Sequence, residues 1–189
     1  MKLLLIDNYD SFTYNIVELL RQLKIDDISI LKNNEVNIEQ ARQFDKIIIS
    51  PGPATPSESG NIVDIIKALS PTHSILGICL GHQAIAEAFG GRLQNLPHPY
   101  HGYQTELQLL RPHKIFSFHT DNSKIKVGLY HSWVVEKFPF PESLEITAIS
   151  TENHIMSMKH KSFDVHGVQF HPESYMTDYG KEIIRGFLS

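Results

Sequence analysis

Short apolar runs alternate with amphipathic stretches along the first half of the chain. The apolar runs predict buried strands over residues 2–6, 28–31, 46–50 and 74–78. Apolar residues recur at helical spacing after Asp10 and Ser11, which are candidate helix caps, and again over residues 62–69 and 83–89. Strands that alternate with helices are joined by right-handed crossovers, so this half predicts a parallel sheet with helices on both faces.

The pattern changes after Gly90 and Gly91, which end the last of these helices. The later strand-like segments have no helices between them and cover residues 105–110, 124–130, 144–150 and 154–160. Residues 178–188 predict a closing helix. We therefore expect an α/β fold, in which a mostly parallel sheet carries a smaller antiparallel extension, within a single domain over residues 1–189.

Composition narrows the class of protein. A length of 189 residues suits one full-sized domain, and the 41% hydrophobic content is ordinary for a globular protein. The net charge of -4 shows no basic excess, which argues against a nucleic-acid partner. One cysteine cannot form an internal disulfide, and the apolar run of residues 3–6 is too short for a signal sequence or a membrane span. We expect a cytoplasmic protein without a membrane partner.

The one cysteine, Cys79, lies between a predicted strand and a predicted helix, with Gly77 and Gly81 on either side. A lone cysteine after an apolar strand is commonly a small buried hydrophobe. Flanking glycines and a following helix favour another interpretation, because they permit a strained turn and because a helix N-terminus lowers a thiol pKa. The pattern therefore predicts a nucleophilic thiol.

Two other segments supply partners for a thiol nucleophile. About ninety residues after Cys79, His171 and Glu173 flank a proline, and this pair can act as a base with an orienting carboxylate. The loop Ser50-Pro51-Gly52-Pro53 follows a predicted strand, and its Gly52 N–H together with that of Leu80 can form an oxyanion hole. A surface turn is the alternative interpretation of the loop alone. Together these segments predict thiol-based acyl transfer.

Metal chemistry is a weaker interpretation of the eleven histidines. His98 and His101 are three residues apart, but the chain has no cysteine pair and no His-Glu-x-x-His motif. We expect no metal site. The segment Tyr130-His131-Ser132-Trp133 stands at a predicted strand end and by itself indicates only core and turn.

The residues around Cys79 (77–83), the loop 50–53 and the segment 167–174 together resemble the class I, triad-type glutamine amidotransferases. The opening Ile6-Asp7-Asn8-Tyr9-Asp10-Ser11-Phe12 is similar to the chorismate-using branch, the glutaminase subunits of anthranilate synthase and aminodeoxychorismate synthase. The resemblance extends from Leu3 to Phe187 and implies a flavodoxin-like fold.

This resemblance implies a role for each matching residue. Cys79 would attack the carboxamide of L-glutamine to form a thioester, His171 would act as base and acid, and Glu173 would orient it. The oxyanion and the substrate would be held by Gly52, Pro53, Leu80, Gln83, Ser132 and Trp133. Ammonia would pass to a separate synthase subunit that uses chorismate. No cofactor is implied for this subunit, and Mg²⁺ is expected only in the synthase partner.

Two positions depart from the pattern of that family. Trp133 stands where the family usually has leucine, which should alter the pocket rim more than binding, since the position acts mainly through its backbone. Tyr103 and Gln104 stand in a His-Gly-Tyr-Gln-Thr stretch where relatives tend to have His-Gly-Lys-Thr, on the side that faces the partner. The second change affects the details of docking.

Three functional alternatives stay open from the sequence. The subunit could serve anthranilate synthase (tryptophan biosynthesis), aminodeoxychorismate synthase (folate biosynthesis) or both, and the sequence hardly separates them. A stand-alone thiol hydrolase on a similar fold is another class, but the opening motif has no role in such enzymes. A non-catalytic binding module is a third, although such modules typically lose the cysteine or the histidine.

Overall fold

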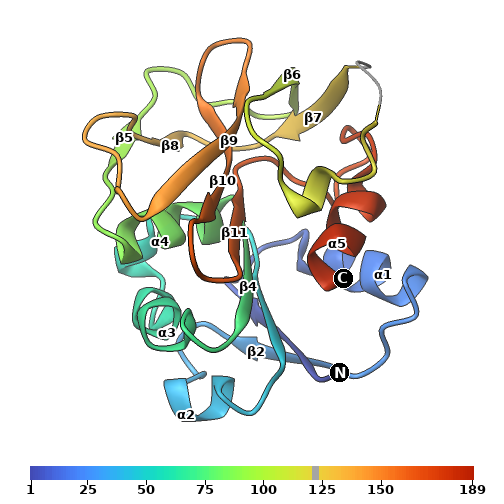
Figure 1. Ribbon diagram of the computed structural model, residues 1–189. Coiled ribbons are helices and arrows are strands. Elements are labelled where there is room, and N and C mark those ends of the chain that lie inside the picture. The colour runs from blue at the N-terminus through green and yellow to red at the C-terminus, as the bar shows by residue number, and fades with distance from the viewer. Residues whose placement is uncertain (121–123) are drawn as a thin grey trace.

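The computed structural model describes residues 1–120 and 124–189 (Figure 1). The helices are α1 (Thr13–Gln22), α2 (Ile38–Ala41), α3 (Ile62–Leu69), α4 (Leu80–Ala88) and α5 (Gly180–Leu188), with short 3-10 turns η1 (Pro56–Glu58) and η2 (Lys114–Phe116). The strands are β1 (Leu3–Asp7), β2 (Ile28–Lys32), β3 (Lys46–Ile49), β4 (Ser74–Ile78), β5 (Leu93–Asn95), β6 (Tyr103–Leu109), β7 (Ile125–Leu129), β8 (Trp133–Val135), β9 (Leu144–Ser150), β10 (Ile155–His160) and β11 (Val165–Val168).

Within the described residues, nine strands form one sheet in the order β2-β1-β3-β4-β11-β10-β9-β6-β7. The pairs from β2 to β11 are parallel. Counted along the chain, these five parallel strands have the order 2-1-3-4-5, which is the flavodoxin-like arrangement. The predicted α/β fold and its mostly parallel sheet are confirmed.

The antiparallel strands continue the same sheet beyond β11. Strands β10, β9, β6 and β7 pair antiparallel in turn, and β5 and β8 form a separate two-stranded ribbon. The sequence pattern did not predict α2, β5, β8 or β11. Strand β11 comes last along the chain yet lies between β4 and β10, so its position depends on long-range pairing that local pattern does not reveal.

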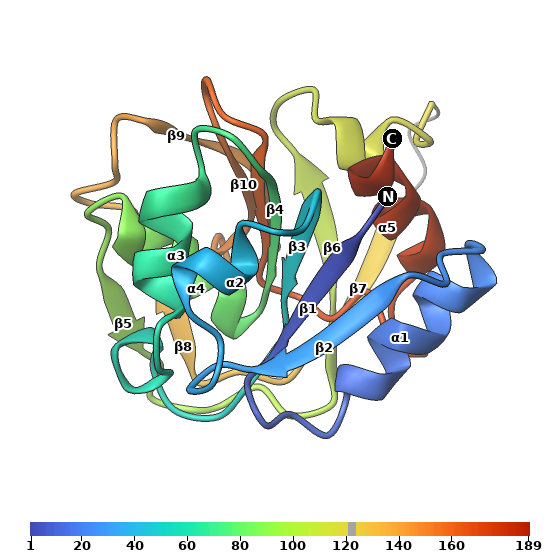
Figure 2. The same ribbon diagram turned by 90° about the horizontal axis from the view of Figure 1, so that it is seen from below.

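The inner parallel strands β1, β3, β4 and β11 are mostly buried on both faces, whereas the edge strand β2 is only partly buried. Along β1, Leu3 and Leu5 belong to the cluster that includes residues of α1 and α5, whereas Leu4 and Ile6 belong to the cluster that includes residues of α3 and α4. Successive strand residues point to opposite faces, so a continuous apolar run fills two cores. Figure 2 shows α1 and α5 on one side of these strands and α2, α3 and α4 on the other.

Two helix starts differ from the sequence pattern. The cap position of α1 is Phe12 and has no side-chain cap, while Asp10 Oδ1 instead accepts a hydrogen bond from the Phe12 N–H at 2.8 Å. The predicted caps at Asp10 and Ser11 were therefore wrong, because these residues belong to the preceding turn. Helix α4 begins at Leu80, three residues before the predicted 83, so Cys79 directly precedes its first turn.

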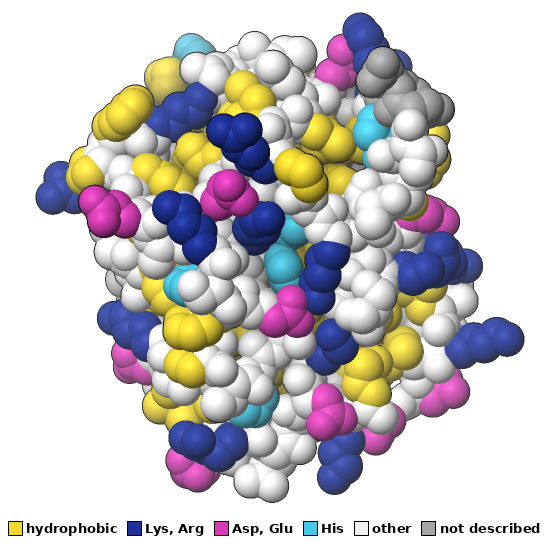
Figure 3. Space-filling view, viewed as in Figure 1, with side chains coloured by type: hydrophobic (Ala, Val, Ile, Leu, Met, Phe, Trp, Pro, Cys, Tyr) yellow, Lys and Arg dark blue, Asp and Glu magenta, His cyan; other side chains and the backbone are white. Residues whose placement is uncertain are grey.

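Charged side chains of both signs are interspersed on the face shown in Figure 3. None of the helices in the described part of the chain combines the length and the apolar character needed to cross a membrane.

Candidate active site

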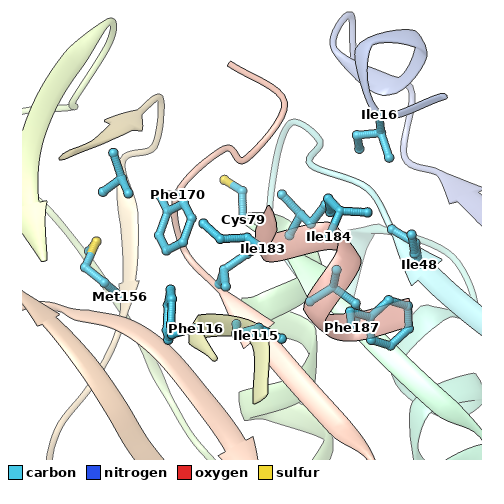
Figure 4. Packing of buried hydrophobic residues seen from close by; sticks show 14 of the residues in the cluster. Ile16, Ile48, Cys79, Ile115, Phe116, Met156, Phe170, Ile183, Ile184 and Phe187 are labelled. Atoms are coloured by element: carbon cyan, nitrogen blue, oxygen red, sulfur yellow. The ribbon is translucent and has the colours of Figure 1, made fainter. Parts of the chain in front are cut away.

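Cys79 occupies a sharp turn between β4 and α4. Its backbone has φ 52° and ψ -99°, an unfavourable conformation for a residue with a side chain. The Cys79 N–H donates to Val168 O at 2.8 Å, which ties the turn to β11. Figure 4 shows the sulfur at the edge of a buried cluster that includes Phe170 and Ile183. The residue is only 5% exposed, so its surroundings set its reactivity.

The two flanking glycines allow close packing of this turn. A Cβ atom at Gly77 would lie 2.3 Å from the carbonyl carbon of Gly81, and one at Gly81 would lie 2.6 Å from Ile49 O. Neither approach leaves room for a side chain. The left-handed φ belongs to Cys79 itself, so the glycines permit the strained turn by letting the helix approach β3 and β4.

His171 lies three residues after β11 and is 2% exposed. Its Nδ1 is 2.7 Å from Oε1 of Glu173, whose side chain is fully buried. The rings of Phe12 and Tyr130 pack edge-on against the imidazole, with centroid distances of 5.7 and 5.0 Å. These contacts fix the orientation of the ring and the tautomer in which Nδ1 carries a proton.

The pKa of His171 lies well above its usual value. Burial lowers this pKa, but the negative charge of Glu173 and the nearby Cys79 side chain raise it by more. The buried Nε2 makes no hydrogen bond of good geometry with any described residue. This nitrogen is therefore available to exchange a proton with the sulfur or with a ligand beside it.

The opening of the chain holds the Pro-Gly-Pro loop in place. Asn8 N–H donates to Ser50 Oγ at 2.9 Å, and the Asn8 side-chain amide donates to Ser50 O at 2.8 Å. A Cβ atom at Gly52 would lie 2.5 Å from the Asn8 Cβ and 2.8 Å from Leu80 Cδ2. Only glycine therefore fits between the opening turn and the first residue of α4. The Leu80 N–H, in the first turn of α4, has no partner within the helix.

A polar pocket of about 140 Å³ opens beside the sulfur. Its lining residues are Cys79, Gly52, Pro53, Ala54, Gln83, Tyr130, His131, Ser132 and Trp133. The fold thus brings five of the predicted substrate residues to one cavity with the thiol. The sixth, Leu80, is adjacent to Cys79 with its side chain buried, and His171, which does not line the pocket itself, packs against the lining residue Tyr130.

Other residues of the site were missed by the sequence interpretation. Ala54 follows the Pro-Gly-Pro loop with φ 66°, and Tyr130 and His131 belong to the 130–133 segment, whose position at a strand end was the available signal. Burial, with the nearby charge of His171, lowers the pKa of His131 to about 3, so its ring is neutral. A larger pocket of about 700 Å³ is lined by residues between 109 and 119, and none of the predicted site residues is among them.

Gln169 is the other missed residue. Its side-chain Nε2 is 3.6 Å from Cys79 Sγ, and its Oε1 accepts from Gln83 Nε2 at 3.2 Å. Gln83 Nε2 also donates to Trp133 O at 2.8 Å. In the sequence, Gln169 could have been recognised as a polar residue between Val168 and Phe170, directly after an apolar strand.

The acidic, histidine and cysteine side chains are also the residue types of metal-binding arrangements. Across residues 1–120 and 124–189, no group of three or more His, Cys, Asp or Glu side chains could hold a metal ion. A buried thiol, an imidazole and a carboxylate beside a small polar pocket are instead the components of nucleophilic acyl transfer.

Known proteins with similar sequences and folds support the same chemistry. The chain is 39% identical over 196 residues to anthranilate synthase component 2 of Pseudomonas putida, covering 100% of this chain and 96% of that protein. It is 37% identical to aminodeoxychorismate/anthranilate synthase component 2 of Bacillus subtilis, covering 98% and 95%. The crystal structure of a candidate GMP synthase protein from Thermoplasma acidophilum superimposes with a TM-score of 0.86 at 28% identity, covering 100% of this chain and 92% of that one.

The family match extends over almost the whole chain. Residues 4–189 match the family described as glutamine amidotransferase class-I. The matched range contains the Cys79 turn, the Pro-Gly-Pro loop and the His171–Glu173 pair. The chain therefore belongs to the class I glutamine amidotransferases and is a triad-type glutaminase.

Proposed function

We propose that this chain is the glutaminase subunit of a chorismate-using synthase, in the first place anthranilate synthase of tryptophan biosynthesis. The observation that carries the proposal is the pocket in which Cys79 meets the loop of Gly52, next to the buried pair of His171 and Glu173. Several relatives that match over nearly their whole length are named anthranilate synthase component 2, among them the Pseudomonas putida protein. The family needs no cofactor, and we expect Mg²⁺ only in the synthase partner.

The proposed reaction has two stages. Cys79 Sγ attacks the side-chain carboxamide carbon of L-glutamine as its proton passes to His171. The oxyanion that forms accepts hydrogen bonds from the backbone N–H groups of Gly52 and Leu80. The C–N bond then breaks, and the proton on His171 passes to the leaving nitrogen to give ammonia. Water hydrolyses the γ-glutamyl thioester to glutamate and restores the thiol.

Gln83 is proposed to bind the amino-acid end of the substrate. Its amide nitrogen already donates to Trp133 O and Gln169 Oε1, which leaves its carbonyl oxygen to accept a hydrogen bond from the α-ammonium group. Ser132 and Trp133 contribute mainly backbone atoms to the same end of the pocket, and Pro53 borders it. Gln83 donates to the backbone oxygen of residue 133, so leucine at position 133 would accept the same hydrogen bond.

A second candidate for the partner synthase has specific support. The Bacillus subtilis relative, at 37% identity, carries both activities in its name. The alternative is therefore a glutaminase of aminodeoxychorismate synthase, in folate biosynthesis, or one subunit shared by both synthases. The stand-alone thiol hydrolase finds no counterpart among these relatives.

Exposed tyrosines beside the site support a macromolecular partner. Tyr175 is 95% exposed and lies two residues after Glu173, and Tyr14 is 69% exposed and lies two residues after Phe12, which contacts the His171 ring. Tyr9 and Tyr103 are also exposed. Aromatic side chains of this kind are enriched at protein interfaces, so we propose these tyrosines as contacts of the synthase partner.

The nucleophile is tested with Cys79→Ser. The variant, assembled with its synthase, should lose product formation from glutamine but keep product formation from ammonium salts, because the synthase active site is untouched. The two rates are measured side by side in the same preparation. Glutamine hydrolysis that persists in this variant would show that another group is the nucleophile.

The partner is tested by co-purification from native extract, followed by assay for both products. Anthranilate alone identifies the tryptophan branch, aminodeoxychorismate alone the folate branch, and both together a shared subunit. Purification of the active glutaminase with neither synthase activity would contradict the proposed partnership.

A further inference from the structure

Gln169 belongs to a chain of hydrogen bonds that runs from a backbone carbonyl to the nucleophilic sulfur. The chain begins at Trp133 O, passes through the side chains of Gln83 and Gln169, and ends at Cys79 Sγ. Gln169 is fully buried, and its backbone N–H donates to Met156 O of β10 at 2.9 Å. Its amide is therefore held against the sulfur by the sheet.

The first contact decides the direction of the whole chain. Trp133 O can only accept a hydrogen bond, so the nearby atom of the Gln83 amide must be its nitrogen. The same nitrogen faces Gln169, so the facing atom of Gln169 must be the oxygen. The nitrogen of Gln169 then points to Cys79, and the sulfur receives an N–H donor.

An N–H donor affects the two ionisation states of a thiol differently. A neutral thiol is a weak acceptor, whereas a thiolate carries a full charge and accepts a stronger hydrogen bond. A donor fixed by the fold therefore favours the thiolate over the thiol. In a site where Cys79 is 5% exposed, water supplies little of this stabilisation.

We propose that Gln169 is a positioning residue for the nucleophile, which holds the Cys79 side chain and stabilises its thiolate through the amide N–H. The inference rests on the proposed role of Cys79. It adds to the triad a second contact to the sulfur, besides that of His171, and this contact links the sulfur to the substrate-binding Gln83.

The test uses the alkylation of Cys79, which is the only cysteine of the chain. The rate of reaction with iodoacetamide, followed by mass spectrometry, is measured against pH for the full-length parent and for Gln169→Met, which keeps a similar volume without a donor. The pH midpoint should rise by about one unit, a tenfold change in the thiol equilibrium. Glutaminase kcat should fall about tenfold or more, with a smaller change in KM.

A second variant and a matched control separate charge from packing. Gln169→Glu still accepts from Gln83 but turns a carboxylate oxygen toward the sulfur, so the midpoint should rise further than in Gln169→Met. Gln108→Glu makes the same chemical change at an exposed position of β6 and should leave the midpoint unchanged. Equal midpoints in the parent and in a folded Gln169→Met protein would overturn the proposal.

A measurement on the unaltered residue covers the case in which both variants fail to fold. The side-chain amide resonance of Gln169 should shift with pH in step with the alkylation midpoint, and this step should be absent from Cys79→Ser. An amide resonance that does not follow the thiol would also overturn the proposal. The alkylation midpoint and the amide resonance do not depend on glutamine turnover. A failure of this proposal about Gln169 is therefore distinguishable from a failure of the proposed function.

Discussion

The His171 ring is held by two kinds of contact, a hydrogen bond to a charged carboxylate and packing against aromatic rings, and the two have different effects. Glu173 accepts from Nδ1 and supplies a negative charge, while the rings of Phe12 and Tyr130 restrict rotation of the imidazole. The geometry of the base is therefore set before a substrate enters, which lowers the entropic cost of reaching the transition state. The proline between His171 and Glu173 limits the backbone that joins them.

His171→Ala should cost more activity than Glu173→Ala. We expect the histidine to move the proton, and loss of such a base costs several orders of magnitude in kcat, whereas we expect the carboxylate only to orient and charge the ring. Glutaminase kcat of both variants is measured in the assembled complex, where ammonia-dependent synthesis serves as the control. A greater loss in Glu173→Ala would assign the two roles the other way round.

Glu173→Gln should lower the pKa of His171. Burial lowers this pKa, and the charge of Glu173 is the largest of the effects that raise it. A neutral amide at position 173 removes that effect and leaves the effect of burial. The imidazolium then loses its proton at a lower pH than in the parent. NMR titration of His171 in the two proteins measures the shift, and an unchanged pKa would exclude a charge effect of Glu173.

At the scale of elements, the site depends on how closely α4 approaches the sheet. The first turn of α4 lies over β3 and β4, and the contact between Gly81 and Ile49 O leaves no space for a methyl group. Strand β11 brings Val168 and Gln169 alongside the same turn. Packing between elements therefore determines where the sulfur points.

Gly81→Ala should reduce both stability and activity. The added Cβ would lie 2.6 Å from Ile49 O, so helix and strand must separate, at a cost of about 1–3 kcal/mol in the free energy of unfolding. The shift moves Cys79, so kcat should fall even where the protein remains folded. Urea unfolding and the alkylation rate of Cys79 measure the two effects.

Gly90→Ala is the matched control for this change. Gly90 lies beyond the other end of α4, with φ 91° and nothing within 4 Å of its added Cβ, so alanine there adds backbone strain without crowding. It should cost stability but leave kcat near the parent value. Equal losses of kcat in both variants would mean that general destabilisation, not displacement of the turn, explains the effect.

For the whole molecule, buried histidines connect stability to pH. Burial lowers the pKa of His82, His113 and His131 to about 3, from an ordinary value near 6.5. The unfolded chain binds protons at these positions between pH 6.5 and 3, and the folded protein does not. Their stabilising effect is therefore fully present above pH 6.5 and is lost as the pH falls toward 3.

The free energy of unfolding should fall between pH 6.5 and pH 4 by about 1.4 kcal/mol per pH unit for each of these histidines. Urea unfolding at several pH values measures the slope. His82→Leu should make the slope shallower, whereas His98→Gln, at an exposed position, should not change it. A free energy of unfolding that is constant over this range would contradict the burial of neutral histidines.

Assembly with the synthase should activate the glutaminase. A freely running glutaminase would waste glutamine, and we propose that a small rotation of the peptide at Gly52 removes one oxyanion donor in the free subunit. Loss of one such donor costs roughly a hundredfold in rate. We expect kcat to rise about that much from the free subunit to the complex with chorismate, and equal kcat values in the free subunit, the complex and the complex with chorismate would exclude this switch.

Much of the fold and the chemical groups of the site could be predicted from the sequence, because both depend on local pattern. Apolar runs and helical spacing identified β1, β3, β4, α1 and α3 to within one or two residues. The glycines around Cys79 predict a thiol nucleophile, and the closely spaced His171 and Glu173 predict a base with an orienting carboxylate; the structure brings these groups together, and their catalytic roles stay predictions. Each of these features occupies only a few residues of the chain, where backbone conformation and side-chain spacing decide the outcome.

Only the tertiary structure decided which of these residues meet and in what charge state. Strand β11 lies between β4 and β10, and this long-range pairing brings His171 and Gln169 to a sulfur some ninety residues away. The sequence contains eleven histidines of equal intrinsic pKa. Burial keeps His131 neutral, whereas the carboxylate of Glu173 raises the pKa of His171, because desolvation and neighbouring charge arise only when distant segments pack together.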